Sequence, residues 1–520
     1  MKKEFNPEED GWDFANWGET GEFDWDLYKD AYLAIDPQDK YDQMFYPLFK
    51  KCAEQGNCGG MSFLALALFK YGGYMGFCSP ASFYEGVQIV DKKTGKVIKK
   101  APIDPALHRA INIFQARQFS KRNVNYVIDL FKKHNLNDAK LAWDTVQAQA
   151  AKGDYAALAI ARDTVATGAH TVIPYKVETS TNGDFVMHIW DSNHPYSADK
   201  THYDDPSTKK LLTISGDPLR AGQDWKYIPD PNADPNDEEK KPYIGSQFKG
   251  AWCFAMPMSL VLIKSRQPMT LENLTNQILT LFVGGTGSAV SQISDDNGHR
   301  FYTKDADVHT SRLEIETDPE KRLQGAIRWP WFSSDSRQEG SGELYFIRRH
   351  KGNTSPLITT VSGANYEFIA CMGKNIIEVN SASKEHSRET IKTYGSVLEA
   401  LSMDVTTTGK KRKVSLNHLL AGATGKEWRT YRLKNIELPK EVPVSINMEK
   451  KMNAMTISCP EKKVQFDLEI QQRFNGKITL RHVGKVSTSP GKMLRLAPKE
   501  WKNLEKTELI KDISEKDRSE

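Results

Sequence analysis

The sequence predicts an α+β protein whose mixed N-terminal domain is followed by β-rich domains. Apolar residues recur at helical spacing mainly in the first third of the chain. After residue 340, short alternating runs separated by Pro, Gly or Asn predict strands and turns instead. Helices and strands that occur in separate blocks indicate an α+β arrangement. The helices expected in the N-terminal part cover residues 41–51, 59–71, 104–120, 123–134, 138–151 and 154–163.

Three domains are expected along the 520 residues. The first spans 1–267 and opens with an acidic segment, 1–40, whose many aromatic residues predict packing onto that domain. The middle domain, 268–425, begins with an apolar helical pattern at 271–282 and continues mainly as strands. Five short strand-like runs in 426–520 predict a small β-sandwich, similar to an immunoglobulin domain.

Composition indicates a soluble globular protein, with 39% hydrophobic and 27% charged residues. No apolar run approaches the roughly 20 residues that span a bilayer. The N-terminus becomes acidic at once and resembles no signal peptide, so the cytosol or leaderless export is expected. The six cysteines lack C-x-x-C pairs, which argues against a zinc site or a disulfide framework.

Charge is distributed unevenly along the chain, although the net charge is only +4. Residues 1–42 carry 13 acidic and 4 basic side chains, whereas residues 410–520 carry 25 basic and 14 acidic ones. A solvated basic surface explains this most simply; otherwise the C-terminal domains contact a protein or an anionic surface. No clear nucleic-acid motif is present, and the short basic run 410–413 is of a kind common on surface loops.

Cys58 stands at the start of the most apolar of the expected helices, in the run G-N-C-G-G-M-S-F-L-A-L. The N-terminus of a helix carries unpaired N–H groups and about half a positive charge, so a thiol at that position ionises readily. Gly56, Gly59 and Gly60 surround the cysteine and are expected to let a substrate backbone approach the sulfur closely. Cys58 is therefore a candidate nucleophile.

A histidine and an aspartate that could activate this thiol come from two strand-like runs further along the chain. The runs 170–177 and 185–190 are separated by an Asn-Gly turn, which predicts an antiparallel hairpin. His170, at the start of the first strand, is then expected beside Asp191, which follows the second. With Cys58, these residues supply a nucleophile, a base and an orienting carboxylate.

At these residues the sequence resembles the papain-like cysteine peptidases, and among them the bacterial staphopains and double-glycine leader peptidases. The likeness rests on three motifs in the family's order: the G-x-C-x-G-M-S helix start at Cys58, the G-A-H-T-V strand at His170 and the I-W-D-S-N ending at Asp191. In staphopain-like proteins an Asn or Asp follows an Ile-Trp pair, which corresponds to Asp191. The resemblance implies a papain-like catalytic domain over 1–267 with a Cys–His–Asp triad.

One position departs from that family. A glutamine six residues before the cysteine ordinarily supplies a side-chain donor to the oxyanion hole, but Cys52 occupies that position here. Gln55 and Asn57 remain as possible replacements, alongside the backbone N–H of Cys58.

The resemblance implies that the protein hydrolyses amide bonds in protein or peptide substrates through a thioester on Cys58. His170 would serve as general base and acid while Asp191 holds its ring. His188 and His194 are less suitable bases, because the first alternates away along its strand and the second lies beyond the turn. The same groups serve side-chain deamidases and acyltransferases, and an inactive papain-like binding protein is a third interpretation. This chemistry needs no metal or organic cofactor.

Overall fold

We describe the protein from a computed structural model. It covers residues 4–17, 23–50, 56–78, 80, 87–90, 97–101, 104–133, 136–162, 169–196, 203, 210–217, 224–229, 242–245, 251–268, 278–284, 289–302, 316, 318, 320–323, 325–328, 343–349, 355–363, 365–372, 375–381, 387–395, 401–409, 412–421, 427–448, 454–498, 501, 504 and 510–513. The chain divides into two compact units, Met1–Gln38 with Asp42–Met269 and Asp39–Tyr41 with Thr270–Glu520. The main division therefore lies beside the boundary expected at residue 267.

The first unit combines helices with short strands. Asp24, Asp104 and Asp138 accept hydrogen bonds from free backbone N–H groups at the starts of α2, α5 and α7, which explains where these helices begin. The helices are α1 (Pro7–Asp10), α2 (Trp25–Ala31), α3 (Lys40–Lys50), α4 (Cys58–Tyr71), α5 (Pro105–Arg117), α6 (Lys121–Lys132), α7 (Ala139–Ala151) and α9 (Ser259–Leu262). The strands are β1 (Val87–Val90), β2 (Val97–Ala101), β3 (Ala156–Ile160), β4 (His170–Thr179), β5 (Phe185–Trp190), β6 (Leu211–Ile214), β7 (Trp225–Tyr227), β8 (Tyr243–Gly245) and β9 (Cys253–Pro257).

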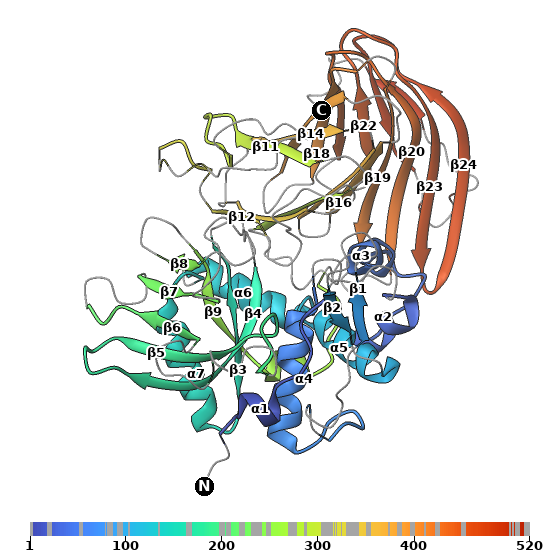
Figure 1. Ribbon diagram of the computed structural model, residues 1–520. Helices are drawn as coiled ribbons and strands as arrows, with labels where there is room; N and C mark the ends of the chain where they lie inside the picture. The colour runs from blue at the N-terminus through green and yellow to red at the C-terminus, as the bar shows by residue number, and fades with distance from the viewer. Residues whose placement is uncertain are drawn as a thin grey trace. The chain divides into compact units, whose positions relative to one another are not determined.

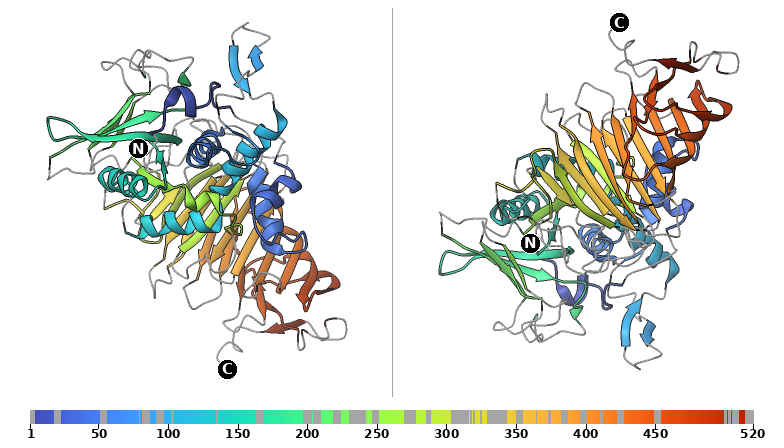
Figure 2. Two further views of the ribbon diagram at one scale, coloured as in Figure 1. Left: turned by 90° about the horizontal axis from the view of Figure 1, so that it is seen from below. Right: turned by 90° about the horizontal axis from the view of Figure 1, so that it is seen from above.

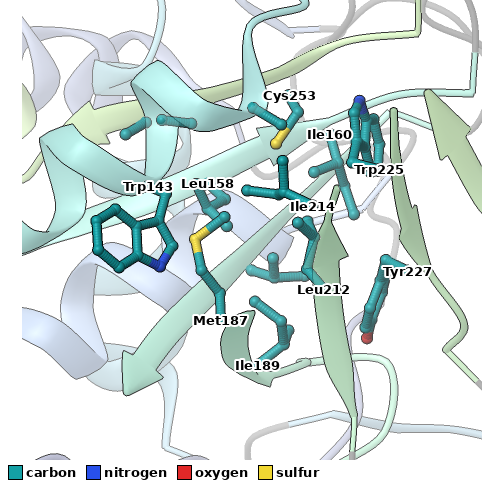
Figure 3. Close-up of a cluster of buried hydrophobic side chains, with 14 of the residues drawn as sticks. Trp143, Leu158, Ile160, Met187, Ile189, Leu212, Ile214, Trp225, Tyr227 and Cys253 are labelled. Carbon is teal, nitrogen blue, oxygen red and sulfur yellow. The ribbon is translucent and has the colours of Figure 1, made fainter. Parts of the chain in front are cut away.

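A seven-stranded antiparallel sheet in the order β8-β7-β6-β5-β4-β3-β9 forms the centre of this unit (Figure 1). One of its faces packs against α7, where Trp143 joins Leu158, Ile160 and the apolar side chains of the neighbouring strands (Figure 3). The alternate residues Ala157 and Ala159 are also fully buried, and α4 contacts β3 and β4. Strand β3 is therefore enclosed on both sides.

The hairpin of β4 and β5 determines where the two sequence-predicted partners of Cys58 lie. Its strands pair antiparallel from Ile173 opposite Trp190 to Thr179 opposite Phe185. Gly183 in the connecting turn has φ +87°, a backbone conformation that favours glycine. Because the strands pair in this register, the first residue of β4 and the last residue of β5 lie at the same end of the hairpin.

Most of the described residues of the second unit lie in strands that form two antiparallel sheets (Figures 1 and 2). The nine-stranded sheet has the order β12 (Ala326–Arg328), β13 (Glu343–Arg348), β10 (Ile278–Gly284), β15 (Tyr366–Met372), β16 (Asn375–Ser381), β19 (Arg412–Ala421), β20 (Trp428–Leu438), β23 (Gln465–Phe474) and β24 (Lys477–Ser487). The eight-stranded sheet has the order β11 (Ala289–Asp295), β14 (Leu357–Gly363), β17 (Ser387–Tyr394), β18 (Ser402–Thr407), β21 (Val444–Met448), β22 (Met455–Ser458), β25 (Met493–Leu496) and β26 (Ile510–Ile513).

From β15 onward the chain places successive strand pairs alternately in the two sheets. The sheets contact each other through a buried ion pair between Arg412 on β19 and Glu389 on β17, and through the hydroxyl of Tyr431, which donates to the carbonyl of Leu496. The sequence predicted a separate sandwich over 426–520. In the structure β20 pairs with β19 along its length, so these strands extend sheets that begin before residue 300.

Two expected helical segments are strands in the structure. Residues 154–163 contain β3, and 278–284 form β10, so the helical pattern read over 271–282 ends in a strand; residues 271–277 lie outside the described residues. A strand that is buried on both faces lacks the polar alternation of a half-exposed strand, and the alanines of β3 favour helices intrinsically. No helix among the described residues is long and apolar enough to span a membrane.

Candidate active site

Cys58 is the first residue of α4, a helix whose residues from Cys58 to Phe69 are all buried. Because this helix has no polar face, it runs through the interior of the unit rather than along its surface. Its N-terminus consequently brings Cys58 to a position where the side chain is only 8% exposed. Gly72 ends the helix in a left-handed conformation, with φ +66°.

Gly59 and Gly60 have a different role from the one expected. A Cβ atom on Gly59 would lie 1.9 Å from Nε2 of Gln118, and one on Gly60 would lie 2.2 Å from the carbonyl oxygen of Ile111. Ile111 in α5 and Gln118, the residue that directly follows this helix, occupy the space that a side chain would need. The glycines therefore allow α4 to pack closely on α5, and this contact accounts for the Gly-Gly pair without a substrate.

His170 and Asp191 lie side by side at the end of the hairpin that is opposite its turn. Nε2 of His170 is 2.7 Å from Oδ1 of Asp191, and both residues are buried. The hydroxyl of Tyr227 donates to the other carboxylate oxygen, Oδ2, at 2.6 Å, and the N–H of Asn193 donates to Oδ1 at 2.8 Å. Three groups thus fix the position of the Asp191 carboxylate, and the carboxylate fixes the orientation of the His170 ring.

The ionisation of Cys58 and His170 is coupled. Burial works against a charged Cys58, but the hydrogen bond to His170, the charge of His170 and hydrogen bonds from Thr171 lower the pKa of the thiol. Burial also works against a charged His170, yet Asp191 and Cys58 raise the pKa of the imidazole to about 10. These directions favour a thiolate facing an imidazolium, the ion pair that an activated cysteine requires.

Asp191 remains ionised beside this pair. Burial alone would raise the pKa of its carboxyl group, but the charge of His170 and the hydrogen bond to it hold that pKa far below its usual range. Since Nε2 of His170 contacts Asp191, Nδ1 is the ring nitrogen left for the thiol. The order of contacts is therefore thiol, imidazole, carboxylate.

Some of the backbone N–H groups at the start of α4 already have hydrogen-bond acceptors within the protein. The N–H of Gly60 donates to Oε1 of Gln115 at 2.9 Å, and the N–H of Met61 closes the first turn on the carbonyl of Asn57. No acceptor for the N–H of Cys58 occurs among the contacts of the described residues. This N–H is available to a ligand oxygen next to the sulfur.

The sequence named Gln55 and Asn57 as side-chain donors of an oxyanion hole, and the structure describes only Asn57. Gln55 lies outside the described residues. Asn57 precedes Cys58 directly, but its side chain is completely buried and its Nδ2 lies 3.5 Å from the carbonyl oxygen of Trp17. The amide of Asn57 thus points into the protein, toward the N-terminal segment.

The two alternative bases, His188 and His194, have contacts of their own. Nε2 of His188 is 2.9 Å from Oε1 of Glu178 on the neighbouring strand. His194 lies in the turn after β5, where its N–H donates to the carbonyl of Asp191. His170 is therefore the histidine that the fold brings to the thiol.

The site also contains residues that the sequence did not indicate. Tyr227, which holds Asp191, comes from the short strand β7, and no local pattern marks it as part of a site. The N-terminal segment packs against the same region, as its aromatic residues predicted: Trp12 is fully buried, and its indole N–H donates to the carbonyl of Met61 at 2.8 Å. Asn16 in this segment contacts both Asn57 and Asn193.

Comparisons with protein-family models, with curated proteins and with solved structures found no match. Within the described part of the chain, no group of three or more His, Cys, Asp or Glu side chains is arranged to hold a metal ion.

Proposed function

We propose that the protein is a papain-like cysteine hydrolase that cleaves amide bonds in proteins or peptides. The observation that supports this most strongly is the continuous contact from Cys58 to His170 to Asp191, buried at the N-terminus of α4. This contact distinguishes Cys58 from Cys253 and Cys371, which are also buried. Burial raises the pKa of Cys253 and of Cys371, neither of which has a histidine partner among the causes of its shift.

In the proposed reaction the thiolate of Cys58 attacks the carbonyl carbon of an amide and forms a tetrahedral oxyanion. The N–H of Cys58 donates a hydrogen bond to this oxygen. His170 transfers its proton to the departing amine as the C–N bond breaks, which leaves a thioester on Cys58. A water molecule, deprotonated by His170, then attacks the thioester and releases the acid and the free thiol.

The test is alkylation with iodoacetamide at pH 6, with the labelled cysteine identified by peptide mapping. We expect Cys58 to react much faster than Cys253 and Cys371, and we expect His170→Ala to remove that advantage. Asp191→Asn should slow labelling less, because it keeps a hydrogen-bond partner for the ring. Labelling of Cys58 at the rate of Cys253 and Cys371, or at an unchanged rate in His170→Ala, would contradict the proposal and favour a binding protein.

A second measurement defines the reaction type. Candidate protein substrates are incubated with the wild-type protein and with Cys58→Ala, and the masses of the products are measured by mass spectrometry. Cleavage splits the chain, whereas deamidation of a glutamine adds about 1 Da, and transfer of its acyl group to an amine adds the mass of that amine less the mass of the ammonia released. Peptide cleavage that requires Cys58 is the expected result.

A further inference from the structure

Asn16 joins the two sides of the proposed active site. Its Oδ1 accepts a hydrogen bond of 2.6 Å from the backbone N–H of Asn57, the residue before Cys58. Its Nδ2 donates to Oδ1 of Asn193 at 3.1 Å, and its backbone N–H donates to the carbonyl of Ser192 at 2.8 Å. The carboxamide therefore lies between the start of α4 and the turn that follows Asp191.

The backbone around Cys58 leaves room for this amide. Gly56 has φ +128°, and a Cβ atom on it would lie 2.7 Å from Nδ2 of Asn16. A side chain at residue 56 would thus displace the NH₂ group. Of the two hydrogens on Nδ2, the contact with Asn193 uses one, and the other remains for a further acceptor.

Other carboxamides near the start of α4 are less suited to meet a substrate. The side chain of Asn57 is completely buried and directed to Trp17. Gln115 and Gln118 are buried and hydrogen-bonded to each other, with Nε2 of Gln118 donating to Oε1 of Gln115 at 2.8 Å. Asn16 is only partly buried, so its amide combines proximity to Cys58 with access to solvent.

We propose that Asn16 is a catalytic residue whose Nδ2 donates to the oxyanion formed on attack by Cys58. It would supply, from the N-terminal segment, the side-chain donor that the sequence lacks six residues before the cysteine. The inference rests on the proposed function, because it assumes acyl transfer at Cys58. Asn16 and the N–H of Cys58 would then form the oxyanion hole together.

The test compares two reactions of the same thiol in the full-length protein. Acylation by p-nitrophenyl acetate passes through a tetrahedral oxyanion and is followed by nitrophenolate release, whereas alkylation by iodoacetamide does not form one. We expect Asn16→Ala to slow acylation about 10²-fold while alkylation changes less than about twofold, as for other oxyanion-hole donors. Intact-mass analysis confirms that both reagents modify Cys58.

Asn16→Asp is the matched variant, because it keeps the oxygen that accepts from Asn57 but loses the NH₂ group. If Asn16 only supports the backbone, Asn16→Asp should acylate like the wild type, and this result would overturn the inference. An equal slowing of both reactions would also overturn it, since it indicates displacement of Cys58. Slow alkylation of the wild type itself contradicts the proposed function, whereas fast alkylation with unaffected acylation in both variants contradicts only the role of Asn16.

Discussion

Nε2 of His170 contacts Asp191, and the Cys58 thiol also interacts with the imidazole. Such an imidazole cannot rotate without losing a charged partner, so its orientation is fixed before any substrate arrives. The same contacts determine ionisation, because each partner stabilises the charge of the next. The reactivity that we propose for Cys58 would thus depend on three residues rather than on the cysteine alone.

The pH dependence of alkylation should reveal this coupling. The lowered pKa of Cys58 and the raised pKa of His170 favour a thiolate–imidazolium pair. The rate constant of the wild type should fall as the pH decreases through the pKa of Cys58, because the thiolate then takes up a proton. In His170→Ala only burial and Thr171 remain, so the fall should begin at a higher pH than in the wild type. Identical profiles for the two proteins would contradict the coupling.

Tyr227→Phe should destabilise the protein through Asp191. The hydroxyl of Tyr227 donates to a buried, ionised carboxylate at 2.6 Å, and such a bond contributes about 1.5–3 kcal/mol to the free energy of unfolding. Tyr126→Phe is the matched control, because that hydroxyl donates to the neutral carbonyl of Ala255 and should contribute about 1 kcal/mol. Urea denaturation measures both, and equal losses would contradict the special role of Tyr227. Only Tyr227→Phe should also slow alkylation of Cys58.

At the level of elements, the site depends on the packing of α4 against α5 and on the hairpin of β4 and β5. The helix contact sets the position of the sulfur, and the hairpin sets the positions of imidazole and carboxylate. Gly59 and Gly60 bring the helices close at adjacent positions, but the obstacles that they face differ. Gly59 faces a side chain, whereas Gly60 faces backbone.

This difference predicts an asymmetry in a double-mutant cycle. Gly59→Ala should cost about 1–3 kcal/mol of stability, and a good part of this loss should disappear in a Gln118→Ala background, where the clashing amide is absent. Gly60→Ala should cost at least as much in either background, because the carbonyl of Ile111 cannot be removed. The free energies of unfolding of the five variants decide the matter. Additive effects of Gly59→Ala and Gln118→Ala would contradict the packing argument.

Short sequence patterns predicted the parts of the candidate site that are formed by residues close together in the chain. An Asn-Gly turn between two strands predicts a hairpin, and the hairpin alone brings His170 to Asp191. The start of α4 at Cys58 likewise follows from an apolar run. Tyr227 and Asn16 could not be found in this way, because their roles depend on sheet order and on the path of the N-terminal segment. Strand β3 was missed because burial on both faces removes the alternation that identifies strands.

At the scale of the whole molecule, each unit buries a histidine, but the surroundings of the two histidines differ. His170 in the first unit lies beside Asp191, whereas only burial shifts the pKa of His418 in the second unit. His418 on β19 is fully buried, and neither ring nitrogen has a hydrogen-bond partner among the described residues. Burial lowers the pKa of His418 to about 3, so it stays neutral in the folded protein well into the acid range.

This histidine should make the second unit sensitive to acid. Below its ordinary pKa of 6.5 the unfolded chain binds a proton at His418 that the folded chain does not, so stability falls as the pH decreases toward 3. The difference amounts to about 2 kcal/mol at pH 5. The stability advantage of His418→Leu over the wild type should therefore be wider at pH 5 than at pH 7.5 by about that amount. Hydrogen exchange of peptides from β19 and β20 measures it, and an advantage independent of pH would count against the prediction.

The arrangement of the proposed catalytic residues along the chain has a consequence for biosynthesis. His170 and Asp191 are 21 residues apart and meet through one hairpin, a structure that closes quickly. Cys58 reaches them only when a helix made much earlier in translation packs against that sheet. Until then the nascent chain carries a thiol without a base, and therefore one of ordinary reactivity. If Cys58 is the nucleophile that we propose, its activation therefore waits until this helix has packed against the sheet.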